Sequence, residues 1–263
     1  MSLMATTAEL DPRGHFRRSS WFHGLSTMTR WDLAGLRLEL PVIIGVQILA
    51  GVGFVLGFGL FFDRIPAPVA LYVSTGVVVI NLTLVGLIIG PQFTADQKLA
   101  GTYDYLRALP VPATAAAVAW FSVTLIGGIP AAVVSLVVAE LRYGISFTIT
   151  PSIVPAVLLT ALTGTMLGYA LSHAMTNPMS TRLIAQLLVF WVMGFSPILY
   201  PASQQPDWLA AINGWLPFEH MATIVRAGLT TGIVSDIGRS YAIVAVWGVI
   251  GTTLAARALV RRG

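Results

Sequence analysis

The residue types that could do chemistry are few and scattered in this chain. Its four histidines are His15, His23, His173 and His220. They form no metal-binding HExxH pattern, and Glu219 merely precedes His220. There is no GxSxG turn to present a serine nucleophile, and the absence of cysteine excludes thiolate chemistry. The only lysine, Lys98, is followed by leucine, so no phosphate-binding GxxxxGKS or GxxxxGKT loop exists. The sequence predicts no enzyme and no bound cofactor or metal.

Charge is instead concentrated in one short segment between two long apolar stretches. The segment includes QKLAGTYDYLRALPVP, residues 97–112, and the aspartate just before it. Its charged and aromatic residues are Asp96, Lys98, Tyr103, Asp104, Tyr105 and Arg107. Tyrosine is enriched at interfaces, and Pro110 and Pro112 end the segment. The pattern predicts a short helix suited to a polar protein interface, with a solvated loop as the alternative.

The composition as a whole indicates an integral membrane protein. The 263 residues are 56% hydrophobic and 10% charged, with a mean hydropathy of +0.81, whereas soluble domains carry roughly 25% charged residues. The charges flank apolar segments, so the net charge of +4 forms no basic patch and predicts no nucleic-acid partner. The first twenty residues contain no apolar run, so we expect no cleavable signal peptide.

A membrane-spanning helix needs about 20 predominantly apolar residues. Six segments meet this requirement, at residues 40–62, 69–91, 113–138, 153–174, 183–200 and 237–258. Proline breaks the third and fourth at Pro130 and Pro155, which packing against neighbouring helices can tolerate. We therefore expect a single all-α integral membrane domain, residues 1–263, with six transmembrane helices.

Lysine and arginine predict the orientation of these helices, because both are enriched in cytoplasmic loops. Six spans place both termini on one side of the membrane, together with the loops at 92–112 and 175–182. That side carries Arg13, Arg17, Arg18, Arg30, Arg37, Lys98, Arg107, Arg182, Arg257, Arg261 and Arg262. The opposite side carries Arg64, Arg142, Arg226 and Arg239. We expect both termini in the cytoplasm of a multi-pass protein of the cell (inner or plasma) membrane.

Residues 1–39 are predicted to form a cytoplasmic tail that ends in an amphipathic helix. One helical face holds Trp21, Leu25, Met28, Trp31 and Leu36, and the opposite face holds His23, Ser26, Arg30 and Arg37. This pattern is typical of a helix that lies in the interface and contacts membrane lipid. Asp32 falls inside the apolar face, where a bare carboxylate is costly. It either extends to the helix surface or a helix-end partner, or makes a buried contact with another protein.

Residues 201–235, before the last span, are too interrupted by proline to cross the membrane and too apolar for an ordinary loop. Proline favours the first turn of a helix, so two short helices are predicted at about 206–214 and 217–229. Such a segment would enter the outer leaflet and return, where protein or water must cover its backbone. We expect an external re-entrant helical segment.

Polar and small residues inside the predicted spans are candidates for helix contacts. Gln47, Asn81 and Gln186 are uncharged, and we expect hydrogen bonds between helices, with lining of a transport pathway as the alternative. Gly53 and Gly57 lie four residues apart in GVGFVLGFG. This spacing permits close approach of another helix, either within the chain or in a dimer.

Two motifs, in this order, resemble those of ABC-2-type permeases, the membrane subunits of bacterial ABC exporters. The first is GTYDYLRALPVP, where the matching positions are Gly101, Thr102, Asp104, Leu106, Leu109, Pro110 and Val111. The second is FSPILYP after the fifth predicted span, followed by Trp208 and a helix-starting Pro217. Leu216 precedes Pro217 where the family commonly has asparagine, which is a departure within the outer segment. The resemblance covers most of the chain.

The resemblance implies a permease subunit without catalytic activity, paired with a second permease of the same or a related chain. It also implies two separate ATP-binding subunits, which would hold the ATP and magnesium that this chain does not bind. In that family the loop after the second span forms a coupling helix that docks on the ATPase. The positions assigned to coupling here are Asp96, Lys98, Gly101, Thr102, Tyr103, Asp104, Tyr105 and Arg107.

Apolar walls with few charges favour a lipid, a glycolipid or a hydrophobic drug as the exported substrate. The alternative function is a secondary transporter, or another six-span membrane protein without an ATPase partner. A secondary transporter would need ionisable groups or discontinuous helices within the membrane, and the predicted spans offer few. A membrane enzyme is disfavoured by the missing catalytic residues.

Overall fold

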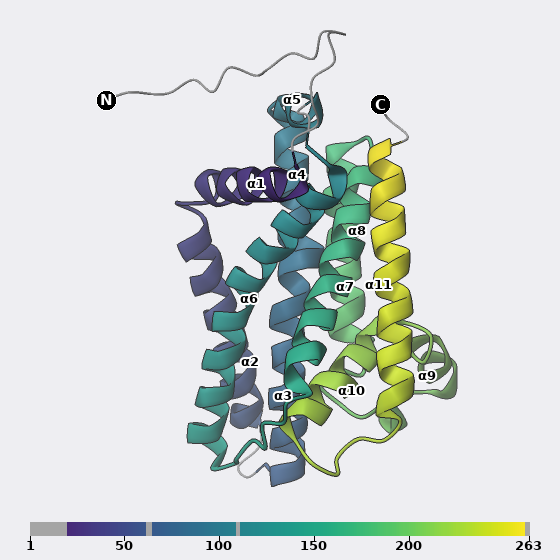
Figure 1. Cartoon of the computed structure of the whole chain (residues 1–263). Coiled ribbons are helices and arrows are strands. Elements are labelled where there is room, and N and C mark those ends of the chain that lie inside the picture. Colours follow the sequence, from purple (N-terminus) through teal and green to yellow (C-terminus); the bar gives the residue numbers. More distant parts are fainter. Residues whose placement is uncertain (1–19, 62–64, 109–110, 261–263) are drawn as a thin grey trace, which may run out of the picture.

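The computed structural model describes residues 20–61, 65–108 and 111–260, and every regular element in that part of the chain is helical. The elements are α1 (Trp21–Gly35), α2 (Leu40–Phe61), α3 (Ala67–Leu84), the π-helical turn η1 (Val85–Ile89), α4 (Gly90–Leu99), α5 (Thr102–Ala108), α6 (Ala113–Tyr143), α7 (Ile153–Ala174), α8 (Pro178–Gly194), the 3₁₀ turn η2 (Ala202–Gln204), α9 (Asp207–Asn213), α10 (Pro217–Leu229) and α11 (Ile237–Val260). The long helices run side by side, and α1 lies across one end of the bundle (Figure 1). The all-α prediction is confirmed.

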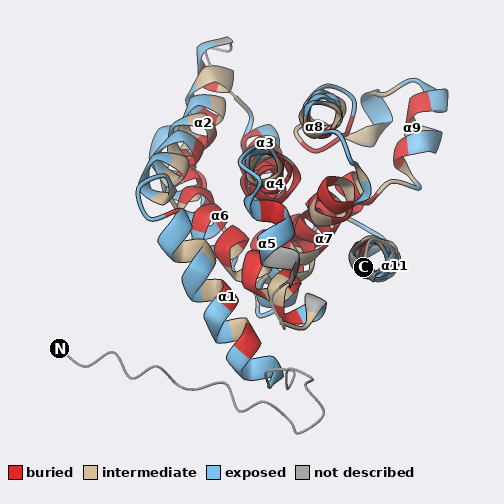
Figure 2. Ribbon diagram, turned by 90° about the horizontal axis from the view of Figure 1, so that it is seen from above, coloured by how far each residue is buried: buried red, intermediate tan, exposed pale blue. Residues whose placement is uncertain are grey.

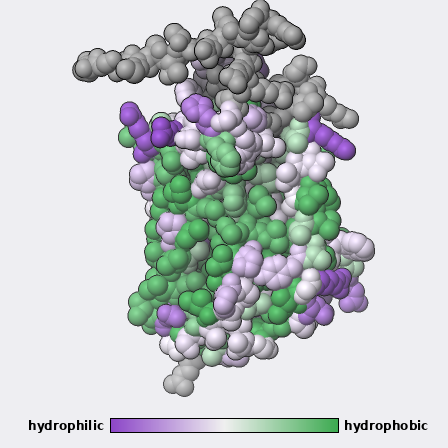
Figure 3. Space-filling view, viewed as in Figure 1, coloured by the Kyte–Doolittle hydropathy of each residue, from purple (hydrophilic) through white to green (hydrophobic). Residues whose placement is uncertain are grey.

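Five helical segments of the described chain are long and apolar enough to cross a membrane. They are Leu40–Leu60, Ala67–Leu99, Thr114–Tyr143, Ile153–Ala174 and Ile237–Ala258. Figure 3 shows hydrophobic residues over the middle of the molecule and hydrophilic residues gathered towards its two ends. This distribution is that of a multi-pass membrane protein, whose apolar belt contacts the hydrocarbon core.

The predicted fifth span, 183–200, corresponds to α8, whose bounds differ. The helix begins at Pro178, because the side chain of Asn177 accepts a hydrogen bond from the amide of Met179 at 2.8 Å and caps the first turn. It ends at Gly194, before the proline at 197. Its 17 residues would be about 25 Å long, which is shorter than the roughly 30 Å hydrocarbon core.

The second predicted span, 69–91, is longer in the structure. Helix is continuous from Ala67 to Leu99 through α3, the π-helical turn and α4. The first part of the expected loop at 92–112 is therefore helical, because no residue between 92 and 99 is a glycine or proline that would end the helix. The chain leaves the bundle only at Gly101, where φ is +73°.

Neither proline that was expected to break a span does so. Pro130 lies inside α6, which is continuous over 31 residues. Pro155 lies in the first turn of α7, where a backbone amide has no partner within the helix and proline is tolerated. The prediction that these two residues break their spans is wrong.

α3 forms the centre of the bundle. In the most apolar part of the continuous helix that α3 begins, Ala67–Leu99, 83% of the residues are buried. The corresponding fraction is 22% for α2 and for α11. Figure 2 shows buried α3 surrounded by its neighbours, whereas α11 lies at the periphery. The backbones of η1 and α7 approach so closely that a Cβ atom on Gly168 would lie 2.0 Å from the carbonyl oxygen of Gly86. Glycine is required at this contact.

The two short helices predicted between 201 and 235 are present as α9 and α10. They lie at the end of the bundle opposite to α5 (Figure 1), and α10 packs against α3, α7 and α11. At the other end, α1 packs against α6: Met28 is buried, and Leu36, just after α1, packs with Trp120 and Val123 of α6. Trp31 of the predicted apolar face is 48% exposed, so that face is only partly buried within the chain.

Candidate coupling surface

The predicted coupling segment forms a helical corner at the end of the bundle. α4 continues the central helix beyond the apolar belt, and α5 follows after the turn at Gly101 (Figure 1). Two kinds of side chain occupy this corner: some attach it to the rest of the chain, and others face solvent. The structure therefore divides the residues that the sequence grouped together.

Lys98 attaches α4 to the end of α7. Its Nζ donates to the carbonyl oxygens of Ser172 at 2.5 Å and of Met175 at 2.6 Å. The last carbonyls of a helix have no partner within the helix and carry the negative end of its dipole, so an ammonium group stabilises them. Lys98 also lies 4.8 Å from the ring centre of Tyr103.

Asp96 attaches α4 to α8 through an ion pair with Arg182. This is the one ion pair among the side chains that the structure describes. Both side chains are partly exposed, so the pair contributes little stability but fixes the relative position of two helices. The sequence placed both residues on the same side of the membrane without indicating that they meet.

Tyr103 is buried although the sequence assigned it to an interface. Its ring centre lies 5.7 Å from that of His173, which stacks on Tyr169 at 3.9 Å. The Nδ1 atom of His173 lies 2.8 Å from the carbonyl oxygen of Tyr169. Aromatic packing thus joins α5 to the last turns of α7.

The outward part of the corner consists of Thr102, Asp104 and Tyr105, all of which are exposed. The side chain of Tyr105 is 64% exposed. The side chain of Arg107 and residues Leu109 and Pro110 lie outside the described part of the chain. Three of the eight predicted coupling residues therefore form an exposed face on α5 that another protein could contact.

A groove of about 390 Å³ adjoins this exposed face. Its walls come from α1, α4 and the start of α5, and its lining is Trp31, Ala34, Gly35, Phe93, Asp96, Gln97, Ala100 and Thr102. Most of these side chains are apolar or small. The amphipathic helix and the coupling corner thus form one continuous surface.

Asp32 lies on the inner side of α1, close enough to Tyr169 of α7 for their charges to interact. Burial raises the pKa of its carboxyl group from 3.8 to about 7. The carboxyl group pairs with no basic side chain within 4 Å among the residues described. The described residues therefore provide no ion-pair partner at the helix end, and the carboxyl group is partly buried against its own chain.

Two of the polar residues predicted inside the spans hydrogen-bond between helices. Gln47 Nε2 lies 3.4 Å from the backbone oxygen of Asn81, whose Nδ2 lies 3.2 Å from Ser135 Oγ. All three are buried and join α2, α3 and α6. Gly51 permits the contact, because a Cβ atom there would lie 2.2 Å from Ser135 Oγ.

Gly53, Gly57 and Gln186 face away from the described chain. A Cβ atom on either glycine would meet nothing within 4 Å, and Gln186 is exposed on α8. Internal packing therefore does not explain the Gly53–Gly57 spacing. These positions contact either lipid or another protein.

Arg226 is a residue whose role the sequence did not reveal. It is 1% exposed in α10, where Nε donates to Thr75 Oγ1 at 3.1 Å and Nη2 donates to the carbonyl oxygen of Ile198 at 2.8 Å. The guanidinium carbon lies 3.4 Å from the ring centre of Tyr72. The only sequence signal is an arginine within the apolar face of an amphipathic helix, at the end of the bundle opposite the coupling corner.

Comparison with known protein families shows to which family the chain belongs. A family model described as ABC-2 family transporter protein matches residues 66–257, which extend from α3 into α11 and include the coupling corner. The helical membrane fold and this match define a membrane component of an ABC transporter, a generally non-catalytic class. The chain belongs to the ABC-2 transporter family. None of the curated proteins compared with the chain matches it.

Proposed function

We propose that the chain is the permease subunit of an ATP-driven exporter that moves a hydrophobic or amphipathic substrate across the cell membrane. A separate ATP-binding subunit binds ATP and magnesium and docks on the exposed face of α5 and the adjoining groove. ATP binding there shifts the permease between two access states, so the partner supplies the free energy.

The observation that supports this proposal is that one face of the coupling corner is exposed while its other face is held against α7. Asp104 and Tyr105 are exposed towards a partner, whereas Lys98 and Tyr103 contact α7 in the same chain. A solvated loop would need neither the buried tyrosine nor the ammonium group at the end of a helix. A force applied to α5 is therefore passed to the central helix and to α7.

The proposed topology has six transmembrane helices with both termini in the cytoplasm. The five long apolar helices provide five spans, and α8 runs beside the α4 end of the central helix as the sixth. Its short length is compatible with a locally thinner bilayer. α1 would lie in the cytoplasmic interface, and α9 and α10 would form the re-entrant segment on the outer side.

A second permease subunit would pack against α2, where Gly53 and Gly57 leave space for another helix. We expect Gly57→Ile to weaken dimer formation, because its side chain would keep the backbones apart. Cross-linking in native membranes measures the dimer, with Gly45→Ile, another open glycine on the same helix, as the matched variant. An unchanged dimer in both variants assigns this face to lipid.

The experiment that tests the proposal is a double charge reversal, Asp104→Arg with Arg107→Glu. Reversal places like charges together at the partner surface and costs about 2–5 kcal/mol for a buried pair, or about 0.2–1 kcal/mol at the rim. We expect less ATPase to co-purify and less substrate-stimulated ATP hydrolysis, with normal expression in the membrane.

Asp207→Arg is the matched control, because Asp207 is an exposed carboxylate in the first turn of α9, far from the coupling corner. It should leave ATPase binding unchanged. Export at the wild-type level by a well-expressed double reversal would contradict the proposal.

A further inference from the structure

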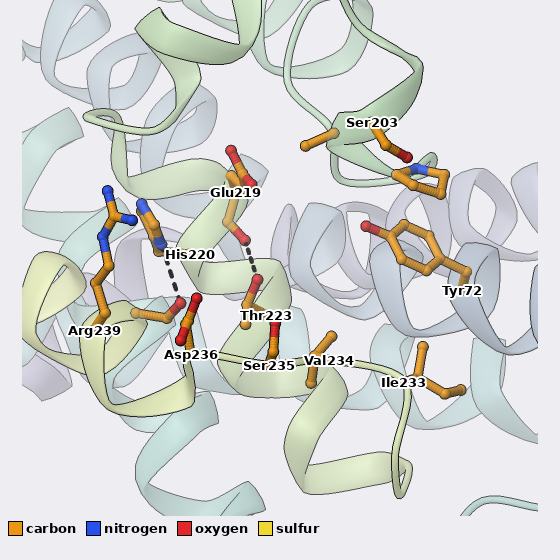
Figure 4. A pocket seen from close by; sticks show the side chains of 13 residues that line it. Tyr72, Ser203, Glu219, His220, Thr223, Ile233, Val234, Ser235, Asp236 and Arg239 are labelled. Atoms are coloured by element: carbon orange, nitrogen blue, oxygen red, sulfur yellow. Dashed lines mark hydrogen bonds between the residues drawn. The ribbon is translucent and has the colours of Figure 1, made fainter.

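A polar pocket opens at the end of the bundle opposite the coupling corner. Its volume is about 330 Å³, which is within the usual range of roughly 300–1,000 Å³ for small-molecule sites. Figure 4 shows side chains from α3, α10, the start of α11 and the connection before α11 around one space. Those that carry the argument are Tyr72, Glu219, His220, Asp236 and Arg239.

The pocket contains charges of both signs without ion pairs. Glu219, Asp236 and Arg239 make no ion pair within 4 Å in the described part of the chain. Partial burial raises the pKa of Glu219, and the nearby His220, Arg239 and Arg226 act in the opposite direction. Two carboxylates and a guanidinium thus line one space without forming an ion pair among the residues described, and those of Asp236 and Arg239 are exposed to solvent.

Two features fix the walls of this pocket. The ring of His220 lies with Nε2 3.1 Å from the carbonyl oxygen of Gly214 and Nδ1 3.1 Å from Ser240 Oγ, so both nitrogen atoms are occupied. Asp236 adopts a left-handed backbone conformation, with φ of 54°, immediately before α11. Aspartate adopts this conformation more readily than most residues, and here it turns the chain into α11.

We propose that this pocket binds a zwitterionic group in which a phosphate is linked to a primary amine, as in the phosphoethanolamine headgroup of a phospholipid. Arg239 pairs with the phosphate, and Glu219 and Asp236 accept hydrogen bonds from the ammonium group. The two opposite charges of the ligand match the two kinds of charge in the pocket. The proposal concerns binding and is independent of the ATPase partner.

A primary amine fits this pocket better than a trimethylammonium group. An ammonium group donates three hydrogen bonds, and carboxylate and hydroxyl oxygens are available from Glu219, Asp236, Ser203 and Ser235. Trimethylammonium groups are recognised by aromatic faces instead. Tyr72 is the one Phe, Tyr or Trp residue in the lining, and the guanidinium of Arg226 already lies over its ring at 3.4 Å.

The position of the pocket favours a lipid as the source of this group. Trp208 and Trp215, on α9 and in the turn that follows it, are 61% and 81% exposed. Exposed tryptophan is enriched at the level of lipid headgroups. The pocket lies at the same end of the bundle, beside the start of α11.

The test compares three lipids with identical acyl chains, which are phosphatidylethanolamine, phosphatidylcholine and phosphatidylglycerol. Each is titrated onto the full-length protein in detergent, and native mass spectrometry measures the dissociation constant. We expect phosphatidylethanolamine to bind roughly tenfold more tightly than the other two, because only it donates ammonium hydrogen bonds. Equal affinity of phosphatidylethanolamine and phosphatidylcholine would overturn the proposal.

Two variants test which side chain of the pocket binds the ammonium group and which binds the phosphate. Glu219→Gln keeps the shape of the side chain and should lower the affinity for phosphatidylethanolamine to nearly that for phosphatidylcholine. Arg239→Gln should lower the affinity for all three lipids by a similar factor. Arg142→Gln removes an exposed arginine outside the pocket lining and should change nothing. An undiminished preference in a Glu219→Gln variant that unfolds at the wild-type temperature would also overturn the proposal.

Competition with free phosphoethanolamine tests whether the pocket binds the headgroup alone or requires the whole lipid. If it competes with the lipid, the headgroup alone is sufficient for binding. If it does not compete while Glu219→Gln still abolishes the lipid preference, the lipid is the ligand. Failure of both the competition and the lipid preference would contradict the site altogether.

Discussion

The ammonium group of Lys98 lies 2.5 Å from the carbonyl oxygen of Ser172, seventy-four positions later in the chain. This bond joins the corner that would contact an ATPase to the end of α7. Replacing Lys98 with methionine keeps the length of the side chain but leaves the carbonyl oxygens of Ser172 and Met175 without this donor.

We expect Lys98→Met to lower the free energy of unfolding by about 1–3 kcal/mol, since hydrogen bonds to charged groups contribute about this much. ATPase co-purification should persist, because Thr102, Asp104 and Tyr105 are unchanged, while export per ATP hydrolysed should fall. Lys98→Arg, which retains donors, is the control. Normal coupling in Lys98→Met would show that this contact does not transmit force.

The close approach of η1 and α7 predicts that Gly168→Ala is destabilising. Its methyl group would lie 2.0 Å from the carbonyl oxygen of Gly86, and relieving such an overlap typically costs about 1–3 kcal/mol. Thermal unfolding in detergent measures the loss. Gly53→Ala, where a methyl group meets nothing within 4 Å, should change stability by less than about 0.5 kcal/mol. Equal stability of the two variants would contradict this packing.

Asp32 predicts that the packing of α1 depends on pH. Burial raises the pKa of its carboxyl group in the folded state to about 7, above the value of 3.8 expected when unfolded. The folded state therefore binds more protons between these two values, and stability falls as pH rises from about 4 to about 7. Below that window Asp32 is protonated in both states and contributes no pH dependence.

Asp32→Asn resembles the protonated side chain and should be more stable than the wild type at pH 8 but not at pH 4. Thermal unfolding at both pH values measures the difference. Asp207→Asn, at an exposed carboxylate on α9, serves as the control. A wild-type pH dependence in Asp32→Asn would assign the effect to another group.

The proposed orientation predicts the accessibility of single cysteines in this cysteine-free chain. A cysteine at Ser235, which is exposed beside the polar pocket, should react with an impermeant thiol reagent added to intact cells. A cysteine at Ala100, exposed in the coupling corner, should react only after the membrane is opened. The reverse pattern would invert the topology.

Most of the helices could be predicted from sequence, because length and hydrophobicity decide whether a segment can span a bilayer. The bounds of α8 could not be predicted, since the cap at Asn177 and the end at Gly194 depend on local hydrogen bonds rather than on hydropathy. The prediction for Pro155 was wrong for another reason. The predicted span, 153–174, has the bounds of α7, and Pro155 therefore lies in the first turn, where proline does not interrupt a helix.

The charges and the family resemblance predict a coupling role for residues 96–107, but they do not predict which of these side chains are buried. Tyr103 and Tyr105 are chemically identical and two residues apart, yet one is buried against His173 and the other is exposed. The turn at Gly101 and the packing against α7 determine which of the two tyrosines is buried. The surroundings of Arg226 likewise depend on tertiary packing, because no local sequence pattern indicates that it contacts Tyr72 and Ile198.

The continuous helix from Ala67 to Leu99 has a mechanical consequence. Its 33 residues form a rod of about 50 Å, with Lys98 near one end and Tyr72 near the other. A tilt of about 6° about one end displaces the other by about 5 Å, without bending the helix or breaking its hydrogen bonds. If an ATPase docks at the Lys98 end as proposed, movement there would displace Tyr72 in the wall of the polar pocket. If ATPase binding changed the affinity of the pocket for its ligand in this way, the ligand would change the affinity for the ATPase by the same factor, because linkage is reciprocal.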